Sequence, residues 1–82
     1  DPMTHDFTTV MKLAGDATLW RIECSCGFVG VWHRERATLA RSIAIHLADV
    51  AGDYVGTVIR YANADQYMPE ARAILAEIGA ER

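Results

Sequence analysis

Apolar and polar side chains alternate in two stretches near the start of the chain, residues 7–13 and 17–24. Such alternation is typical of strands with one buried face, and Gly15-Asp16 between the stretches favours a β-turn. If Ala14 lies opposite Ala17 in this hairpin, directly opposed residues share a face. That register predicts a buried face made of apolar side chains and one thiol: Phe7, Met11, Leu13, Trp20, Ile22 and Cys24.

A turn containing Gly27 leads into residues 28–32, whose apolar and β-branched side chains predict a third strand. Residues 34–50 then repeat apolar side chains at helical spacing without an internal Gly or Pro, and Gly52 favours a helix end. The helical stripe comprises Leu39, Ile43, His46, Leu47 and Val50. This stretch therefore predicts one long helix after the strands.

The remainder of the chain contains one ambiguous stretch and one helical pattern. In residues 54–62, the spacing of apolar side chains fits a helix while the β-branched content fits a buried strand, and we favour the helix. Pro69 suits a first helical position and Gly79 a helix end, so we predict a final helix between them. Its apolar stripe comprises Ala71, Ile74, Leu75 and Ile78. This stripe needs cover, which favours a homodimer or a protein partner docked on the helix.

Together the elements predict an α+β fold: a three-stranded antiparallel sheet packed by one long helix, with a helical C-terminal extension. We expect Trp20 and Ile22 to lie beneath the long helix, because the hairpin and the helix each present one apolar face. The 82 residues have the size of one small domain, in which a metal, a disulfide or a partner often supplements the core. The predicted domain spans residues 3–82, because Asp1-Pro2 is expected to be a remnant that precedes the natural start at Met3.

Composition and charge narrow the functional classes. Hydrophobic residues make up 51% of the chain and charged residues 23%, which is typical of a folded globular protein. The formal net charge of -3 provides no overall attraction to nucleic acid or to an anionic membrane. Apolar stretches fall short of the roughly 20 residues of a membrane span, and no signal-peptide pattern is present, so we expect a cytoplasmic protein. Enzyme motifs are also missing, so we expect neither catalysis nor a small-molecule substrate.

The clearest chemical pattern is Cys24-Ser25-Cys26-Gly27, a turn that carries two thiols. The predicted third strand leads away from this turn at about 3.3 Å per residue, so His33 lies at the far end. The predicted helix returns at about 1.5 Å per residue and brings His46 back to the turn. Two thiolates and an imidazole in one place predict a structural zinc site formed by Cys24, Cys26 and His46.

Three candidates remain for the fourth ligand. His5 is the best of them, because the hairpin register places the start of the first strand beside the end of the second. Asp49 lies one helical turn after His46 and offers an oxygen ligand, and water is the third candidate. In an alternative without metal, Cys24 and Cys26 are reduced structural thiols. A disulfide between them is disfavoured, because Cys-x-Cys would close a small, strained ring.

Residues 19–50, with the Cys-x-Cys-Gly turn and His46 on the following helix, resemble the ββα zinc finger. They also resemble small Cys-x-Cys-Gly proteins of actinobacteria and their phages. The chain departs from the finger pattern in its cysteine spacing, in the long interval before His46 and in lacking a second helix histidine, so no base-reading positions are carried over. The resemblance implies zinc as a cofactor, and a phage or actinobacterial source for a protein that binds and modulates a host protein.

Two surface features bear on the functional hypotheses. The leading hypothesis is a non-enzymatic protein-interaction module, in which aromatic side chains anchor a partner. The candidate anchors are Trp32, Tyr54, Tyr61 and Tyr67. The alternative is a nucleic-acid-binding regulator that uses Arg34, Arg36 and Arg41 near the start of the long helix. Because Glu35 interleaves these arginines and the chain is acidic overall, we favour a solvated helix face over phosphate binding.

Overall fold

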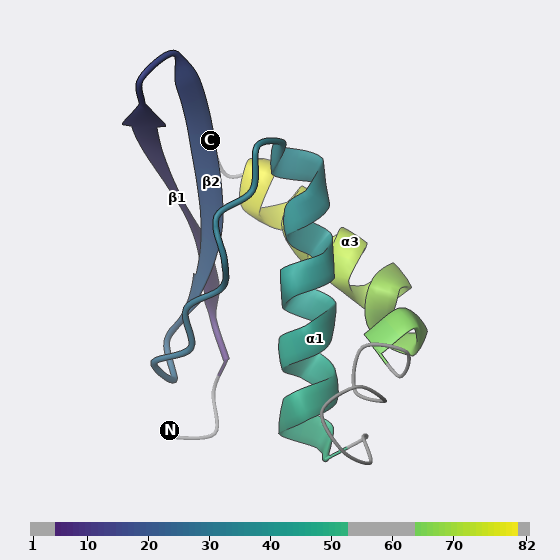
Figure 1. The fold of residues 1–82 in the computed structure, drawn as a ribbon. Helices are drawn as coiled ribbons and strands as arrows, with labels where there is room; N and C mark the ends of the chain where they lie inside the picture. Colours follow the sequence, from purple (N-terminus) through teal and green to yellow (C-terminus); the bar gives the residue numbers. More distant parts are fainter. Residues whose placement is uncertain (1–4, 53–63, 81–82) are drawn as a thin grey trace.

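The computed structural model describes residues 5–52 and 64–80. In chain order, the described part forms a β-hairpin, a 3-10 turn, a helix, a second 3-10 turn and a second helix (Figure 1). These elements are β1 (Phe7–Ala14), β2 (Ala17–Cys24), η1 (Arg36–Thr38), α1 (Leu39–Ala51), η2 (Ala64–Tyr67) and α3 (Met68–Ala80). The ambiguous stretch 54–62 lies outside the described residues.

The hairpin forms in the predicted register. Ala14 pairs with Ala17 beside the turn, and Phe7 pairs with Cys24 at the other end of the antiparallel ladder. Gly15 occupies the turn with a φ of 63°, a conformation that favours glycine because it has no Cβ. The turn chemistry and the alternation together fix which residues of the two strands face each other.

Burial along the hairpin is concentrated at the end that carries Cys24. Ile22 is fully buried there, and Phe7 is buried beside it. The other end of the hairpin extends past the helices (Figure 1), so Met11 and Leu13 are 53% and 75% exposed. The prediction of a buried face is therefore wrong at the turn end, because alternation identifies a face but does not say how far a helix covers it.

The predicted third strand is wrong, because the described chain forms a two-stranded sheet. Residues 28–33 run beside β2 but pair with it only at two isolated bridges, Glu23 with Val29 and Trp20 with His33. Between these two bridges the segment has one residue more than β2 has. Such an extra residue is a β-bulge, which interrupts the regular ladder.

Gly30 lets this segment pack closely against α1. Its N–H donates to the carbonyl oxygen of Ile22 at 2.8 Å. A Cβ at position 30 would lie only 3.2 Å from Ser42 Oγ of α1, so a larger residue would push against the helix. Ser42 Oγ in turn lies 2.9 Å from His33 Nε2, and this contact ties the end of the segment to the helix. The segment thus joins the hairpin to α1 without completing a strand.

In residues 5–52 and 64–80 the structure has two helices of equal length, 13 residues each, and not one long helix with an extension. The first begins at Leu39 and not at Arg34, because η1 precedes it, and it ends where Gly52 adopts a φ of 68°. The second runs through Gly79, which the sequence predicts as its end; a Cβ there would lie 3.1 Å from Arg36 Nη2. Within the described ranges, neither helix is long and apolar enough to cross a membrane.

One hydrophobic core joins the hairpin to both helices. Ile22 of β2 is fully buried together with Leu39 and Ile43 of α1, which confirms that this side of the hairpin packs beneath the helix. Trp20 packs at the margin of the core and is only partly buried. The second helix adds its predicted apolar stripe to the same core: Ala71, Ile74, Leu75 and Ile78. The chain itself therefore covers much of the stripe that suggested a dimer.

Candidate metal centre

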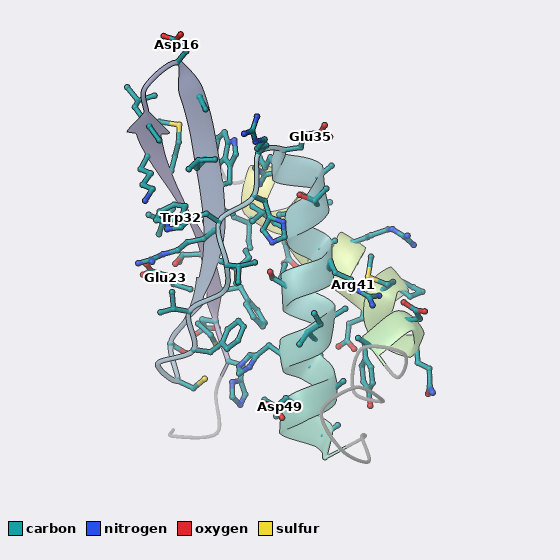
Figure 2. All side chains as sticks on the ribbon, in the orientation of Figure 1. Asp16, Glu23, Trp32, Glu35, Arg41 and Asp49 are labelled. Carbon is teal, nitrogen blue, oxygen red and sulfur yellow. The ribbon has the colours of Figure 1, made fainter. Side chains whose placement is uncertain are left out.

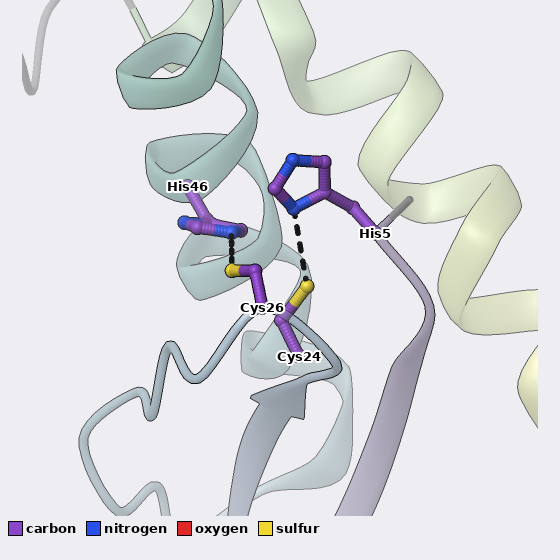
Figure 3. Close-up of side chains that lie close together, drawn as sticks. All are labelled: His5, Cys24, Cys26 and His46. Carbon is purple, nitrogen blue, oxygen red and sulfur yellow. Dashed lines mark hydrogen bonds between the residues drawn. The ribbon is translucent and has the colours of Figure 1, made fainter. Parts of the chain in front are cut away.

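Four side chains meet where the hairpin ends beside α1 (Figure 3). They come from the residue before Asp6, the end of β2, the turn after it and α1: His5, Cys24, Cys26 and His46. The possible ligand atoms of all four lie within 4.8 Å of one another. The structure thus brings the two thiols and His46 together with His5, the preferred fourth candidate, and the cluster could hold a metal ion.

Two hydrogen bonds hold the start of the chain against the cysteine turn. The Ser25 N–H donates to the Asp6 carbonyl oxygen at 3.0 Å, and the Asp6 N–H donates to Ser25 Oγ at 3.0 Å. Because Asp6 directly follows His5, these bonds fix the backbone from which the His5 ring extends. The hairpin register and the Ser25 side chain together position His5 beside the two thiols.

Gly27 shapes the turn that presents the two thiols. Its φ of 104° lies in a region that side chains with a Cβ rarely adopt. The Gly27 N–H donates to the Cys24 carbonyl oxygen at 2.9 Å, and the Cys24 N–H donates to the Phe28 carbonyl oxygen at 2.9 Å. These bonds reverse the chain tightly, with Cys24 buried and Cys26 exposed.

Aromatic packing orients the ring of His46, which is only 6% exposed. Phe28 stacks on the ring with centroids 4.1 Å apart and an interplanar angle of 12°. Phe7 and His5 contact it edge-on, with centroids 5.7 and 5.2 Å away. In this orientation His46 Nε2 lies 3.2 Å from Cys26 Sγ.

Two sulfur–nitrogen pairs of the cluster have close to the spacing that one tetrahedral metal ion gives its ligands. Cys26 Sγ lies 3.2 Å from His46 Nε2, and Cys24 Sγ lies 3.4 Å from His5 Nδ1. Ordinary Zn–S and Zn–N bonds place sulfur and nitrogen about 3.5 Å apart around one ion. Among the described residues, His46 Nδ1 is the buried side-chain polar atom without a hydrogen-bond partner. A metal bond at Nε2 would offset the cost of burying this ring.

Burial changes the protonation of two of these side chains. It lowers the pKa of His46, as does the nearby His5 ring, while Asp49 acts in the opposite direction. The imidazole is therefore neutral at pH 7, which is the form that binds a metal. Burial is also the main cause that raises the pKa of Cys24, against a hydrogen bond from the Cys26 backbone that lowers it. A divalent metal ion bound at the cluster would favour the thiolate of Cys24.

The excluded His33 and the alternative ligand Asp49 both lie outside the cluster. His33 lies away from the turn, as predicted, and its Nε2 contacts Ser42. Asp49, the alternative fourth ligand, is exposed near the C-terminal end of α1 (Figure 2). Sequence reasoning did not assign a role to Phe28, whose ring stacks on His46. The sequence offers one indication of this role: Phe28 directly follows the Cys-x-Cys-Gly turn, and the returning helix must pass that turn.

Comparison of the chain with models of protein families, with curated proteins and with solved structures finds no match. The fold and the site therefore define the class: a small α+β domain with a candidate Cys2His2 metal centre. The order of hairpin and helix and the cluster of thiols and imidazoles agree in outline with the resemblance to zinc fingers.

The arginines predicted as a basic group are partly engaged within the molecule. Arg36 Nη2 donates to the Leu75 carbonyl oxygen of α3 at 3.4 Å. Arg41 forms an ion pair with Asp65 of η2, and it extends from α1 on the side that faces α3 (Figure 2). Arg34 is exposed. Arg36 therefore joins η1 to α3, and Arg41 joins α1 to η2.

Trp32 lies against the outer face of the hairpin, as Figure 2 shows. Lys12 Nζ and Arg21 Cζ lie 4.3 and 4.6 Å from its ring centroid, so two cations of the same chain contact its π system. Of the other predicted anchors, Tyr67 packs against the core, while Tyr54 and Tyr61 lie outside the described residues. The described aromatic side chains are thus largely occupied by contacts within the chain.

Proposed function

We propose that the chain is a small, non-enzymatic protein-interaction module stabilised by one zinc ion, with His5, Cys24, Cys26 and His46 as ligands. The observation that carries the proposal is the convergence of two thiols and two imidazoles within 4.8 Å. Across residues 5–52 and 64–80, no second group of three or more His, Cys, Asp or Glu side chains is so placed.

The chemistry of the donor set supports zinc. Tetrahedral sites with two sulfur and two nitrogen ligands are typical of zinc, whereas magnesium and calcium prefer oxygen ligands. The carboxylate nearest in sequence to His46, that of Asp49, is not part of the cluster. Burial keeps the His46 imidazole neutral, which is the form that binds zinc, and a bound zinc ion would offset the raised pKa of the Cys24 thiol.

The number of protein ligands supports a structural role for the ion. Four ligands complete a tetrahedral coordination shell and leave no position for water or substrate, unlike the open shell of catalytic zinc. The ion would connect the segment before β1, the cysteine turn and α1. Such a connection stabilises a domain of 82 residues, whose core is small.

The small size and the resemblance to actinobacterial and phage proteins support a protein partner, such as a host protein. A nucleic-acid-binding regulator is the second hypothesis, but the net charge of -3 and the internal contacts of Arg36 and Arg41 do not favour it. Retention on a DNA duplex at physiological salt, with a steep salt dependence, would reverse this preference.

Elemental analysis of protein purified without added metal tests the zinc proposal. We expect close to one equivalent of zinc in the wild type and its loss in Cys24→Ser and His46→Gln, because each change removes one ligand. His33→Gln is the matched control, since this histidine lies outside the cluster, and it should retain the zinc. A wild type that neither carries nor takes up zinc contradicts the proposal, as does full retention by Cys24→Ser.

A further inference from the structure

A cleft of about 440 Å³ lies next to the candidate metal centre, between the start of β1 and α3. His5 and Phe7 line one side of it, and Ile74 and Ile78 of α3 line the other. Figure 3 shows α3 passing beside the His5 side chain. Phe7 is buried and the two isoleucines are half-buried, so the cleft has apolar walls that reach the surface.

Two carboxylates flank these apolar walls, Asp6 on the side of β1 and Glu77 on α3. Both side chains are exposed. Neither carboxylate forms an ion pair with a cation of the described part of the chain. The chain as a whole carries a formal net charge of -3. The cleft therefore combines apolar surface with two carboxylates that no cation of residues 5–52 and 64–80 pairs, which is complementary to a long cationic side chain.

We propose that this cleft binds an arginine side chain of a protein partner. The proposal rests on the interaction module proposed above and specifies the chemistry of its partner. The methylene groups of arginine match the walls at Ile74 and Ile78, and its flat, weakly hydrated guanidinium stacks on the His5 ring. The guanidinium donors suit the carboxylates of Asp6 and Glu77. Lysine lacks the planar fork of donors, so it binds less tightly.

The cleft and the metal centre share His5. His5 Nδ1 lies 3.4 Å from Cys24 Sγ, and the backbone of Asp6 is bonded to Ser25 in the cysteine turn. A metal ion at the centre therefore fixes the side of the cleft that carries the imidazole and the Asp6 carboxylate. The two sites are linked through the side chain of His5. The cleft is therefore tested in the zinc-loaded protein, in which that side chain is held in place.

An NMR titration of the zinc-loaded protein tests the proposal with a short capped peptide in which one arginine is flanked by glycines. The matched peptides carry lysine, or citrulline, which keeps the shape of arginine and lacks its charge. We expect saturable shifts confined to the signals of residues 5–8 and 74–78 with the arginine peptide. The lysine peptide should bind less tightly, and the citrulline peptide should produce no such shifts.

A pair of double variants isolates the role of the two carboxylates. Asp6→Asn with Glu77→Gln should weaken binding of the arginine peptide about tenfold, because two exposed ion pairs are lost. Asp16→Asn with Glu35→Gln removes the same charge from the opposite end of the hairpin and from the residue before η1 (Figure 2). This control should bind like the wild type, since neither residue lines the cleft.

Several outcomes would overturn the proposal. One is equal binding of the arginine and citrulline peptides, and another is equal loss of affinity in the two double variants. A Glu77-dependent dimer in light scattering would mean that a second copy occupies the cleft. Zinc content is measured on the same samples. Zinc-loaded protein that does not bind the arginine peptide contradicts only the cleft. Protein that takes up no zinc but binds the peptide contradicts only the zinc proposal.

Discussion

The imidazole of His46 is oriented mainly by its aromatic neighbours. Phe28 stacks on one face of the ring, and Phe7 contacts it edge-on. Its buried Nδ1 has no hydrogen-bond partner among the described residues, so no acceptor fixes the ring from that side. In many metal sites a hydrogen bond to the second nitrogen performs this role. Here the shape of the surrounding apolar side chains has to perform it.

Phe28→Ala should therefore weaken zinc binding although it removes no ligand. We expect a loss of about tenfold in affinity, at the lower end of what changes in ligand-orienting residues cost. Competition with a coloured chelator measures this affinity. Phe28→Tyr retains the ring and serves as the control, with affinity close to that of the wild type. Equal affinity in Phe28→Ala would show that stacking does not orient His46.

At the scale of the elements, the hairpin is covered by helices over only part of its length. Ile22, near the candidate metal centre, is fully buried between the hairpin and α1. Leu13 belongs to the apolar face that the alternation predicts, together with Ile22. Because it lies near the turn, it is nevertheless 75% exposed. The contribution of an apolar strand residue to stability should thus depend on its distance from the turn.

Ile22→Ala should lower the free energy of unfolding by about 2–5 kcal/mol, because it leaves a cavity in a packed core. Leu13→Ala should change it by no more than about 0.5 kcal/mol, because an exposed side chain loses little on truncation. Urea unfolding of both zinc-loaded variants measures the difference. Similar losses in the two variants would mean that the turn end of the hairpin is buried in solution.

The sequence predicts the pairing within the hairpin and the return of α1 to the cysteine turn, because both follow from regular periods. The register needs only the turn at Gly15 and a period of two, and the position of His46 needs only the rise of a helix. The bulge before His33 interrupts the strand period. The apolar composition of residues 28–33 does not reveal it, because the same residues would fit a regular strand. The stacking of Phe28 is likewise invisible to periodicity, because it depends on tertiary packing.

In the whole molecule, one metal ion would connect three parts of the chain that a small core otherwise holds together. The largest fully buried side chains are Ile22, Leu39 and Ile43. Domains of this size bury a smaller fraction of their surface than larger ones and gain correspondingly less from the hydrophobic effect. Metal binding and folding should therefore be coupled.

Chelation should lower the melting temperature of the protein, and added zinc should restore it. A ligand that binds only the folded state stabilises it by about 4 kcal/mol when its free concentration is a thousand times Kd. Thermal unfolding followed by circular dichroism at several free zinc concentrations tests this. Magnesium is the control ion, because its preference for oxygen ligands makes it a poor substitute. A melting temperature that does not depend on zinc would contradict a stabilising role.

The two close donor pairs of the cluster span similar lengths of chain. His5 and Cys24 are 19 residues apart, and Cys26 and His46 are 20 residues apart. Cross-linking a loop of this length removes about 3 kcal/mol of chain entropy from the unfolded state. An ion retained by the two cysteines after unfolding would be a common anchor for both loops, so either histidine could return to it first. The order in which the N-terminal segment and α1 dock would then be free to vary from one folding event to the next.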